Sequence, residues 1–382
     1  MRNSLSKRRA KICILTSVHP VFDPRIFHKQ AKTLVTAGYD VALVAQHDKE
    51  EIVDGVRIVP LPTPKNRLER MAKTVWKVLR LAWKEKADVY HFHDPELIPV
   101  GLILKVFGKK VIYDVHEDVP EQILSKEYMP KFLRRLICKP FRVFENRSSK
   151  FFDFVITATD GIRDKFLKYT PNVVDVKNYV SLEYAKNHVT RHDNRNVLRL
   201  IFVGGIYGER GITEGIKAIN LLPDLPLEFL LYGFADSKFL LELRKLDRLG
   251  RLEYQGTIPY TEVMNKLRHA DIGFICDCPL KRHKESLPVK LFEYMAAGLP
   301  SIASEFPLWK QIVEKHNCGL CVDPQKPEQI ANAIRYLYEN RDVRRCMGQN
   351  ARKAILEEYN WEVEGKTLLA VYESIVAGGR KG

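Results

Sequence analysis

The chain has 382 residues, enough for two domains of ordinary size, each with its own hydrophobic core. Its formal net charge of +15 predicts an anionic partner, such as a phosphorylated substrate, a membrane surface or nucleic acid. The first apolar run, residues 12–15, is too short for a signal peptide, and no stretch is long enough to span a membrane, so we expect a cytoplasmic protein. Seven scattered cysteines argue against a disulfide framework.

The first half of the chain alternates apolar runs with helical patterns, which is the order that a parallel α/β sheet requires. A helix is expected over residues 24–37, directly after the first strand. The expected strands of this half are residues 11–17, 41–45, 89–92, 110–115 and 154–158.

The same alternation restarts after a polar stretch, residues 185–196, which we expect to link two domains. Further strands are expected at 199–203, 228–232 and 272–275, with helices at 213–222 and 260–269 and a last helix at 362–376. Two such units predict two Rossmann-like domains, each with its ligand-binding edge at the carboxyl ends of the strands.

The segment 285–300 contains the most informative helix of the chain. Pro288 suits a first helical turn because it lacks only an N–H that has no partner there, and Ser286 is the expected N-cap. Gly298 marks the end of the helix.

Two acids and a lysine of this segment form a candidate ligand site. Glu285 is expected just outside the positive end of the helix, and Lys290 and Glu293 lie within it. A helix N-terminus beside a carboxylate and a lysine suits a ligand that carries both phosphate and hydroxyl groups. By spacing alone, a solvated helix whose acids pair with nearby lysines remains the alternative.

A second candidate is the loop that follows strand 199–203. The strand ends in Gly204-Gly205, and the loop continues to Arg210 before a helix opens. Glycines let a ligand approach the backbone, and an arginine can bind phosphate with two hydrogen bonds. This loop therefore predicts a phosphate site.

Segment 285–300 has the sequence Glu-Ser-Leu-Pro-Val-Lys-Leu-Phe-Glu-Tyr-Met-Ala-Ala-Gly-Leu-Pro. It resembles the Glu-x7-Glu signature of the retaining glycosyltransferases of family 4, also called glycosyl transferases group 1. The resemblance implies the GT-B fold, in which two Rossmann-like domains face each other across a cleft. It implies an acceptor-binding domain over 1–184, a nucleotide-sugar-binding domain over 197–361, and a helix at 362–382 that packs back on the first domain.

The same resemblance assigns roles to individual residues. Glu293 would hold the ribose hydroxyls of the donor, Glu285 would contact the sugar, and His116 would orient sugar and acceptor. Gly204, Gly205, Arg210 and Lys290 would surround the diphosphate. Gly205 stands where the family has an arginine, and Lys290 is the candidate to replace that contact.

The N-terminal half offers further candidates near its strand ends. Asp23 and Arg25 stand where the family has a glycine-rich loop, so they are candidate donor or acceptor contacts, with helix capping by Asp23 as the alternative. His91, His93 and His116 together would suit a metal ion. Because the family generally needs no metal, we expect neither a metal nor another cofactor.

Two basic stretches, residues 65–86 and 131–150, interleave apolar and aromatic residues with lysine and arginine. We expect their apolar faces to pack mostly on the sheet and their basic faces to hold the protein near an anionic membrane.

The family resemblance implies a retaining, metal-independent hexosyl- or N-acetylhexosaminyltransferase. Its donor would be a nucleotide-diphosphate sugar, with UDP favoured over GDP, and its acceptor a lipid-linked or polysaccharide molecule of cell-envelope or exopolysaccharide synthesis. The expected location is the inner face of the membrane. The alternatives are a nucleotide-sugar epimerase with the same fold and a nucleic-acid-binding protein, although no recognition motif supports the latter.

Overall fold

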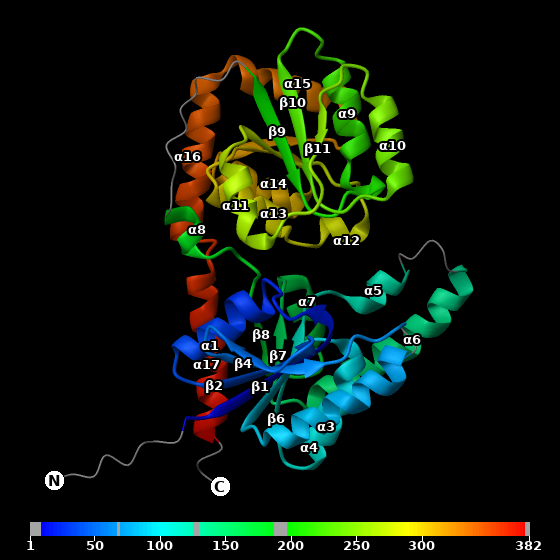
Figure 1. The fold of residues 1–382 in the computed structure, drawn as a ribbon, viewed down its shortest axis with the longest axis vertical. Coiled ribbons are helices and arrows are strands. Elements are labelled where there is room, and N and C mark those ends of the chain that lie inside the picture. Colours follow the sequence, from blue (N-terminus) through cyan, green and yellow to red (C-terminus); the bar gives the residue numbers. More distant parts are fainter. Residues whose placement is uncertain (1–8, 67–68, 125–129, 187–196, 379–382) are drawn as a thin grey trace, which may run out of the picture. The chain divides into compact units, whose positions relative to one another are not determined.

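The computed structural model describes residues 9–66, 69–124, 130–186 and 197–378 (Figure 1). The chain forms two compact units, Met1–Asn178 with Val363–Gly382, and Tyr179–Glu362. The expected linker at 185–196 lies mostly outside the described residues. Its first two residues are not a linker, because they end helix α8 (Leu182–Lys186) of the second unit.

The first unit is built on an eight-stranded sheet with the order β3-β4-β2-β1-β5-β6-β7-β8. All neighbouring strands run parallel except the hairpin partners β3 and β4. The five expected strands are present, and the hairpin and the edge strand β8 are additions to them. The strands are β1 (Lys11–Pro20), β2 (Asp40–Gln46), β3 (Glu51–Val53), β4 (Val56–Leu61), β5 (Val89–Phe92), β6 (Lys110–Val115), β7 (Phe154–Thr157) and β8 (Val173–Asp175).

The helix expected over 24–37 begins with a π-helical segment, Ile26–Ala31, and continues as α1 (Lys32–Thr36). The other helices of this unit are α3 (Val75–Glu85), α4 (Ile98–Val106), α5 (Val119–Leu124), α6 (Lys131–Ser148), α7 (Asp160–Leu167) and α17 (Trp361–Gly378). Helix α17 joins residues far apart in sequence, since the hydroxyl of Tyr372 lies 2.6 Å from Nδ1 of His91 in β5.

The expectation that the apolar face of residues 131–150 packs on the sheet is wrong for much of helix α6, because polar residues of this helix point inward. Glu145 is buried and accepts hydrogen bonds from the Tyr113 hydroxyl and from Lys165, both at 3.0 Å. Phe132 and Leu136 on the other side are 71% and 66% exposed. These hydrogen bonds offset the cost of burying the Glu145 carboxylate. The face that carries Glu145 is therefore the buried one, and the opposite, apolar face is exposed.

Helix α3 packs only part of its apolar residues on the sheet, although the expectation for residues 65–86 was that most would pack there. Val75, Val78 and Ala82 are buried against the sheet, whereas Trp76 and Trp83 are exposed. The π-helical turn Arg70–Thr74 precedes this helix.

The second unit has a six-stranded parallel sheet with the order β11-β10-β9-β12-β13-β14. From β9 the chain moves outward on one side through β10 and β11, and from β12 it moves outward on the other. The point between β9 and β12 is the switch point at which such sheets bind ligands. The strands are β9 (Leu198–Val203), β10 (Leu227–Tyr232), β11 (Leu252–Tyr254), β12 (Ile272–Ile275), β13 (Ser301–Ser304) and β14 (Gly319–Val322).

Helices cover both faces of this sheet and bury two apolar clusters. Phe292, Met295 and Trp309 belong to one cluster, and Ile216 and Ile334 to the other. The helices are α9 (Ile212–Asn220), α10 (Ser237–Leu246), α11 (Tyr260–Arg268), α12 (Lys281–Lys284), α13 (Val289–Ala296), α14 (Pro307–Lys315), α15 (Pro327–Glu339) and α16 (Arg341–Glu357).

Candidate functional site

The loop after β9 places Arg210 at the switch point of the second sheet. Gly204 and Gly211 have φ angles of 135° and 66°, which glycine adopts most easily. Arg210 donates from one guanidinium nitrogen to Oδ2 of Asp277 at 2.5 Å, and Asp277 follows β12 and is buried. The Arg210 side chain remains 27% exposed. A ligand at the strand ends can therefore reach a guanidinium that a buried carboxylate holds in place.

Lys290 lies beside the same loop, in the first turn of α13. A Cβ atom added to Gly204 would lie 3.3 Å from Cε of Lys290, so the absence of a side chain at position 204 makes room for the lysine. Burial lowers the pKa of Lys290 to about 8, and the positive charge of Arg210 lowers it too, while Asp277 and Glu293 oppose the shift. Two cationic side chains thus meet at one strand edge, as an anion site requires.

The two acids of the Glu-x7-Glu segment occupy different environments. Glu293 is buried in α13, about one turn after its start. Glu285 is exposed and ends the short helix α12. In the described part of the chain, no hydrogen bond or ion pair joins Glu285 to Arg210 or Lys290.

The prediction that Ser286 caps helix α13 is wrong. Helix α13 begins at Val289 after Pro288, and no side chain caps it. The hydroxyl of Ser286 instead donates to the carbonyl oxygen of His283 at 3.3 Å, because residues 281–284 form a helical turn of their own. Gly298, with a φ of 67°, ends α13 as expected.

Sequence reasoning missed Asp277 and the charged residues around it. Glu209 pairs with Arg282, and His283 lies beside them with Nδ1 at 2.9 Å from the carbonyl oxygen of Cys278. The sequence did offer one signal, because Asp277 is the second residue after a predicted strand, at the edge where α/β sheets bind ligands.

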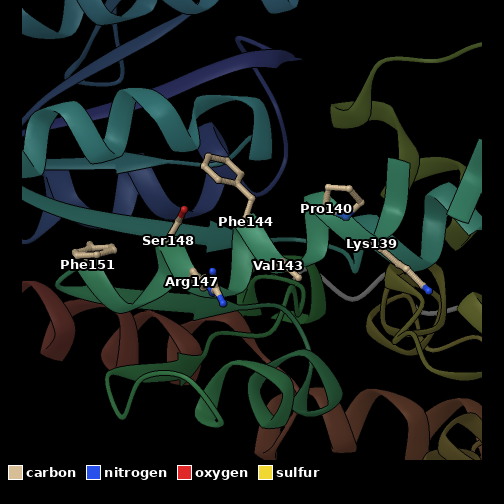
Figure 2. Close-up of a pocket in the computed structure, with 7 residues that line it drawn as sticks. All are labelled: Lys139, Pro140, Val143, Phe144, Arg147, Ser148 and Phe151. Atoms are coloured by element: carbon tan, nitrogen blue, oxygen red, sulfur yellow. The ribbon is translucent and has the colours of Figure 1, made fainter. Parts of the chain in front are cut away.

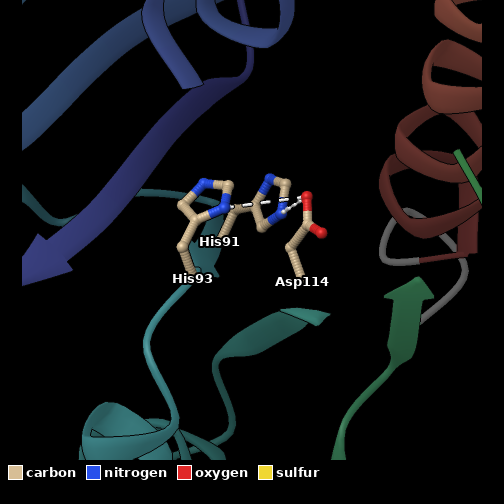
Figure 3. A group of neighbouring side chains, drawn as sticks. All are labelled: His91, His93 and Asp114. Atoms are coloured by element: carbon tan, nitrogen blue, oxygen red, sulfur yellow. Dashed lines mark ion pairs between the residues drawn. The ribbon is translucent and has the colours of Figure 1, made fainter. Parts of the chain in front are cut away.

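In the first unit, the structure brings the separate histidine candidates into one cluster at the ends of β1, β5 and β6. His93 Nδ1 lies 3.0 Å from His116 Nε2, and the ring centroids of His19 and His116 are 5.0 Å apart. Figure 3 shows His91 and His93 side by side, with Asp114 next to them. Such imidazoles can donate to or accept from the hydroxyls of a ligand.

Asp114 is the centre of this cluster and is fully buried. Arg25 donates to both of its carboxylate oxygens, at 3.0 and 3.2 Å, and Gln30 donates to Oδ2 at 2.5 Å. Burial alone would raise the pKa of Asp114, but Arg25 and the histidines hold it well below its usual range. Arg25 also donates to the carbonyl oxygen of Val176 and is 3% exposed. Its role in this structure is therefore to hold Asp114 in position from the buried side of the cluster.

Asp23 has a local role as well as a place in the cluster. Its Oδ1 accepts hydrogen bonds from the backbone N–H groups of Arg25 at 2.8 Å and Ile26 at 2.9 Å, which caps the first helix. Its Oδ2 lies 3.3 Å from Nδ1 of His19. Both uses proposed for Asp23 are therefore compatible with its geometry.

The pKa values of two neighbouring imidazoles, those of His116 and His19, are shifted in opposite directions. Burial, with Arg25 adding to it, lowers the pKa of His116 to about 3, against the attraction of Asp114. Burial also acts on His19, but its contact with Asp23 and the charge of Asp94 raise its pKa. His116 is thus a neutral hydrogen-bonding group beside a histidine that holds its proton more tightly.

These two units match two family models. Residues 25–176 match the model described as "Glycosyl transferase 4-like domain", and residues 186–354 match the model described as "Glycosyl transferases group 1". Among curated relatives, the phosphatidyl-myo-inositol mannosyltransferase of Mycolicibacterium smegmatis is 23% identical over 374 residues, or 92% of this chain and 89% of that protein. An uncharacterized glycosyltransferase of Methanocaldococcus jannaschii is 25% identical over 239 residues, 59% of either chain.

Solved structures agree on the fold. Sucrose-phosphate synthase from Thermosynechococcus elongatus has a TM-score of 0.78 at 20% identity, over 97% of this chain and 100% of that one. HepE of Anabaena, in complex with UDP-glucose, has a TM-score of 0.71 at 15% identity, over 95% and 99%.

The fold and the family models define a glycosyltransferase with the GT-B fold. Within that class, the chain belongs to the group 1 glycosyltransferases, of the family 4 type. The alternatives of an epimerase and of a nucleic-acid-binding protein are therefore set aside.

Proposed function

We propose that this glycosyltransferase moves a hexosyl or N-acetylhexosaminyl group from a nucleotide-diphosphate sugar, preferably a UDP-sugar, and retains the anomeric configuration. The observation that carries the proposal is the meeting of Arg210 and Lys290 at the switch point of the second sheet. The complex of Anabaena HepE with UDP-glucose supports the choice of UDP.

The proposed chemistry breaks the bond between the sugar and the diphosphate and forms a bond from the sugar to an acceptor hydroxyl oxygen. The hydroxyl proton passes to the leaving diphosphate. Arg210 and Lys290 stabilise the negative charge that develops on that group, so no metal ion is needed there. Glu293 holds the ribose, Glu285 contacts the sugar, and His116 orients sugar and acceptor.

The assay is transfer and slow donor hydrolysis across a panel of UDP- and GDP-sugars, with the product anomer read by NMR. One UDP-sugar should be consumed with retention, and activity should survive EDTA. Lys290→Met should lower turnover, whereas Lys326→Met, at an exposed site, should not. Inversion, or complete loss of activity with EDTA that added metal restores, would overturn the corresponding part of the proposal.

We further propose a lipid-linked or polysaccharide acceptor of cell-envelope or exopolysaccharide synthesis, reached at the inner face of an anionic membrane. The mycobacterial relative, named for phosphatidyl-myo-inositol, supports a lipid acceptor. In the described part of the chain, no helix is both long and apolar enough to cross a bilayer.

The outer side of α6 supports contact with the membrane. Val143, Phe144 and Phe151, drawn as sticks in Figure 2, line a hollow of about 520 Å³. The basic residues Lys139 and Arg147 line the same hollow. Apolar side chains next to basic ones suit the interface of an anionic bilayer.

Vesicle flotation tests the membrane contact. The protein should float with anionic lipid at low salt, and neutral lipid or high salt should weaken binding, because each basic residue near the surface adds roughly 1 kcal/mol. Leu136→Ser, or charge reversal at Lys73, Lys77 and Arg80, should reduce flotation without changing donor affinity. Failure of the wild type to float on anionic vesicles at low salt would refute membrane docking.

A further inference from the structure

The histidine cluster of the first unit contains a group of side chains with the composition of a transition-metal site. His91, His93 and Asp114 each offer one ligand atom, and these atoms lie within 4.8 Å of one another (Figure 3). We propose that these three residues, with His116 as a fourth ligand, bind one divalent transition-metal ion such as Zn²⁺. The ion would act as an inhibitor, since it would remove His116 from the proposed sugar site.

The separations between the ligand atoms support a tetrahedral site. Asp114 Oδ2 lies 3.5 Å from His91 Nε2 and 3.6 Å from His93 Nδ1. His116 Nε2 lies 3.0 Å from His93 Nδ1 and 3.7 Å from Asp114 Oδ1. Ligands bound at about 2.0–2.1 Å in a tetrahedron are roughly 3.3 Å apart, within the range of these distances. His91 and His93 face Oδ2 of Asp114, whereas His116 faces Oδ1. Binding therefore needs a closer approach of His91 and His93, whose ligand atoms lie within 4.8 Å of each other, and a shift of His116 toward them.

The surroundings of the cluster orient its ligands. The Tyr372 hydroxyl lies 2.6 Å from Nδ1 of His91, which turns Nε2 toward Asp114. That Nε2 atom is buried and makes no hydrogen bond within normal distance to any described residue. Gln30 holds the Asp114 carboxylate from behind. Metal-binding histidines and carboxylates are commonly fixed by such outer hydrogen bonds.

Charge is the main objection, because the Arg25 guanidinium on Asp114 opposes a cation. His19, whose pKa is raised, opposes a cation as well when it is protonated. The three carboxylates of Asp23, Asp94 and Asp114 exceed these two positive groups in number. Asp94 is held by the Thr16 hydroxyl at 2.8 Å and so stays in position. The surplus of negative charge favours binding of a cation at the exposed edge of the cluster, where His116 is partly accessible.

Titration of metal-free full-length protein with ZnCl₂, followed by calorimetry, tests the site. One ion should bind per chain, and Co²⁺ should give the absorption spectrum of a tetrahedral site. His93→Gln should weaken binding at least tenfold, whereas His269→Gln, in exposed helix-end surroundings, should leave it unchanged. Thermal unfolding would check that both variants fold. A ratio well below one ion per chain, or equal affinity in His93→Gln, would refute the site.

Only the inhibitory consequence rests on the proposed function. Zn²⁺ should lower transfer by the wild type, EDTA should restore it, and nucleoside diphosphate affinity should stay the same because Arg210 and Lys290 belong to the other unit. Metal binding without any transferase activity would leave the site standing and refute the proposed function. Metal binding with undiminished transfer would refute the inhibition.

Discussion

Replacement of Lys290 by methionine should weaken binding of UDP, because it removes one cation from the proposed diphosphate site and keeps most of the side-chain volume. A hydrogen bond to a charged group contributes about 1.5–3 kcal/mol, which corresponds to roughly a 10- to 150-fold loss of affinity. The ammonium group also lies over the Phe202 ring, with Nζ 4.8 Å from the ring centroid, and methionine would lose that cation–π contact as well. Calorimetry at pH 7 measures the loss.

The pH dependence of the same binding gives a second reading. With the Lys290 pKa at about 8, the ammonium form falls from about nine-tenths of the free protein at pH 7 to about one-tenth at pH 9. A raised pH therefore removes the charge that the diphosphate needs, and affinity should fall about tenfold over that interval. Lys290→Met should lack this part of the pH dependence, and Lys326→Met should keep it.

UDP binding by Lys290→Met within twofold of the wild type at pH 7 would refute the role of Lys290 in phosphate binding. A wild-type affinity that stayed constant between pH 7 and pH 9 would refute it too. Either result would separate Lys290 from the phosphate and leave Arg210 as the proposed anion ligand.

Three further predictions concern the two units. Arg210→Ala should weaken UDP binding by about 1.5–3 kcal/mol in calorimetry, and unchanged affinity in a folded variant would remove it from the site. Glu285→Gln and His116→Ala should lower turnover but leave donor affinity largely intact, and full activity in both would refute their roles. Gly211→Ala should cost more than about 2 kcal/mol of unfolding free energy in urea, because its new Cβ would overlap a backbone carbonyl oxygen in addition to the strain of a positive φ. Gly250→Ala, where a Cβ would meet no atom within 4 Å, is the control and should cost less.

Many elements could be predicted because their signals are local. The apolar runs at Val89–Phe92, Lys110–Val115 and Ile272–Ile275 have the predicted strand bounds. Gly298 ends α13 because a positive φ is needed there. The hairpin of β3 and β4 was not anticipated, since β3 has only three residues at the edge of the sheet and the mostly buried β4 is interrupted by Arg57 and Pro60.

The candidate site was predictable only in part. Arg210 and Lys290 stand in a recognisable loop and helix, and the structure places Lys290 beside Gly204 and Arg210 against Asp277. Asp277 follows a strand that was predicted correctly, but its partner is 67 residues away. The sequence contains no local signal for a contact of that length, because strand order decides it.

The sequence by itself determined the class of protein. The signals were the alternation of strands and helices and the sequence motif that contains Glu285 and Glu293. Only the tertiary structure decided which residues of the first unit meet. It joined His19, His93 and His116 because β1, β5 and β6 are adjacent in the sheet. It also exposed the apolar side of α6, where the pattern alone predicted burial. A periodic pattern identifies the two faces of a helix, but only its neighbours determine which face is buried.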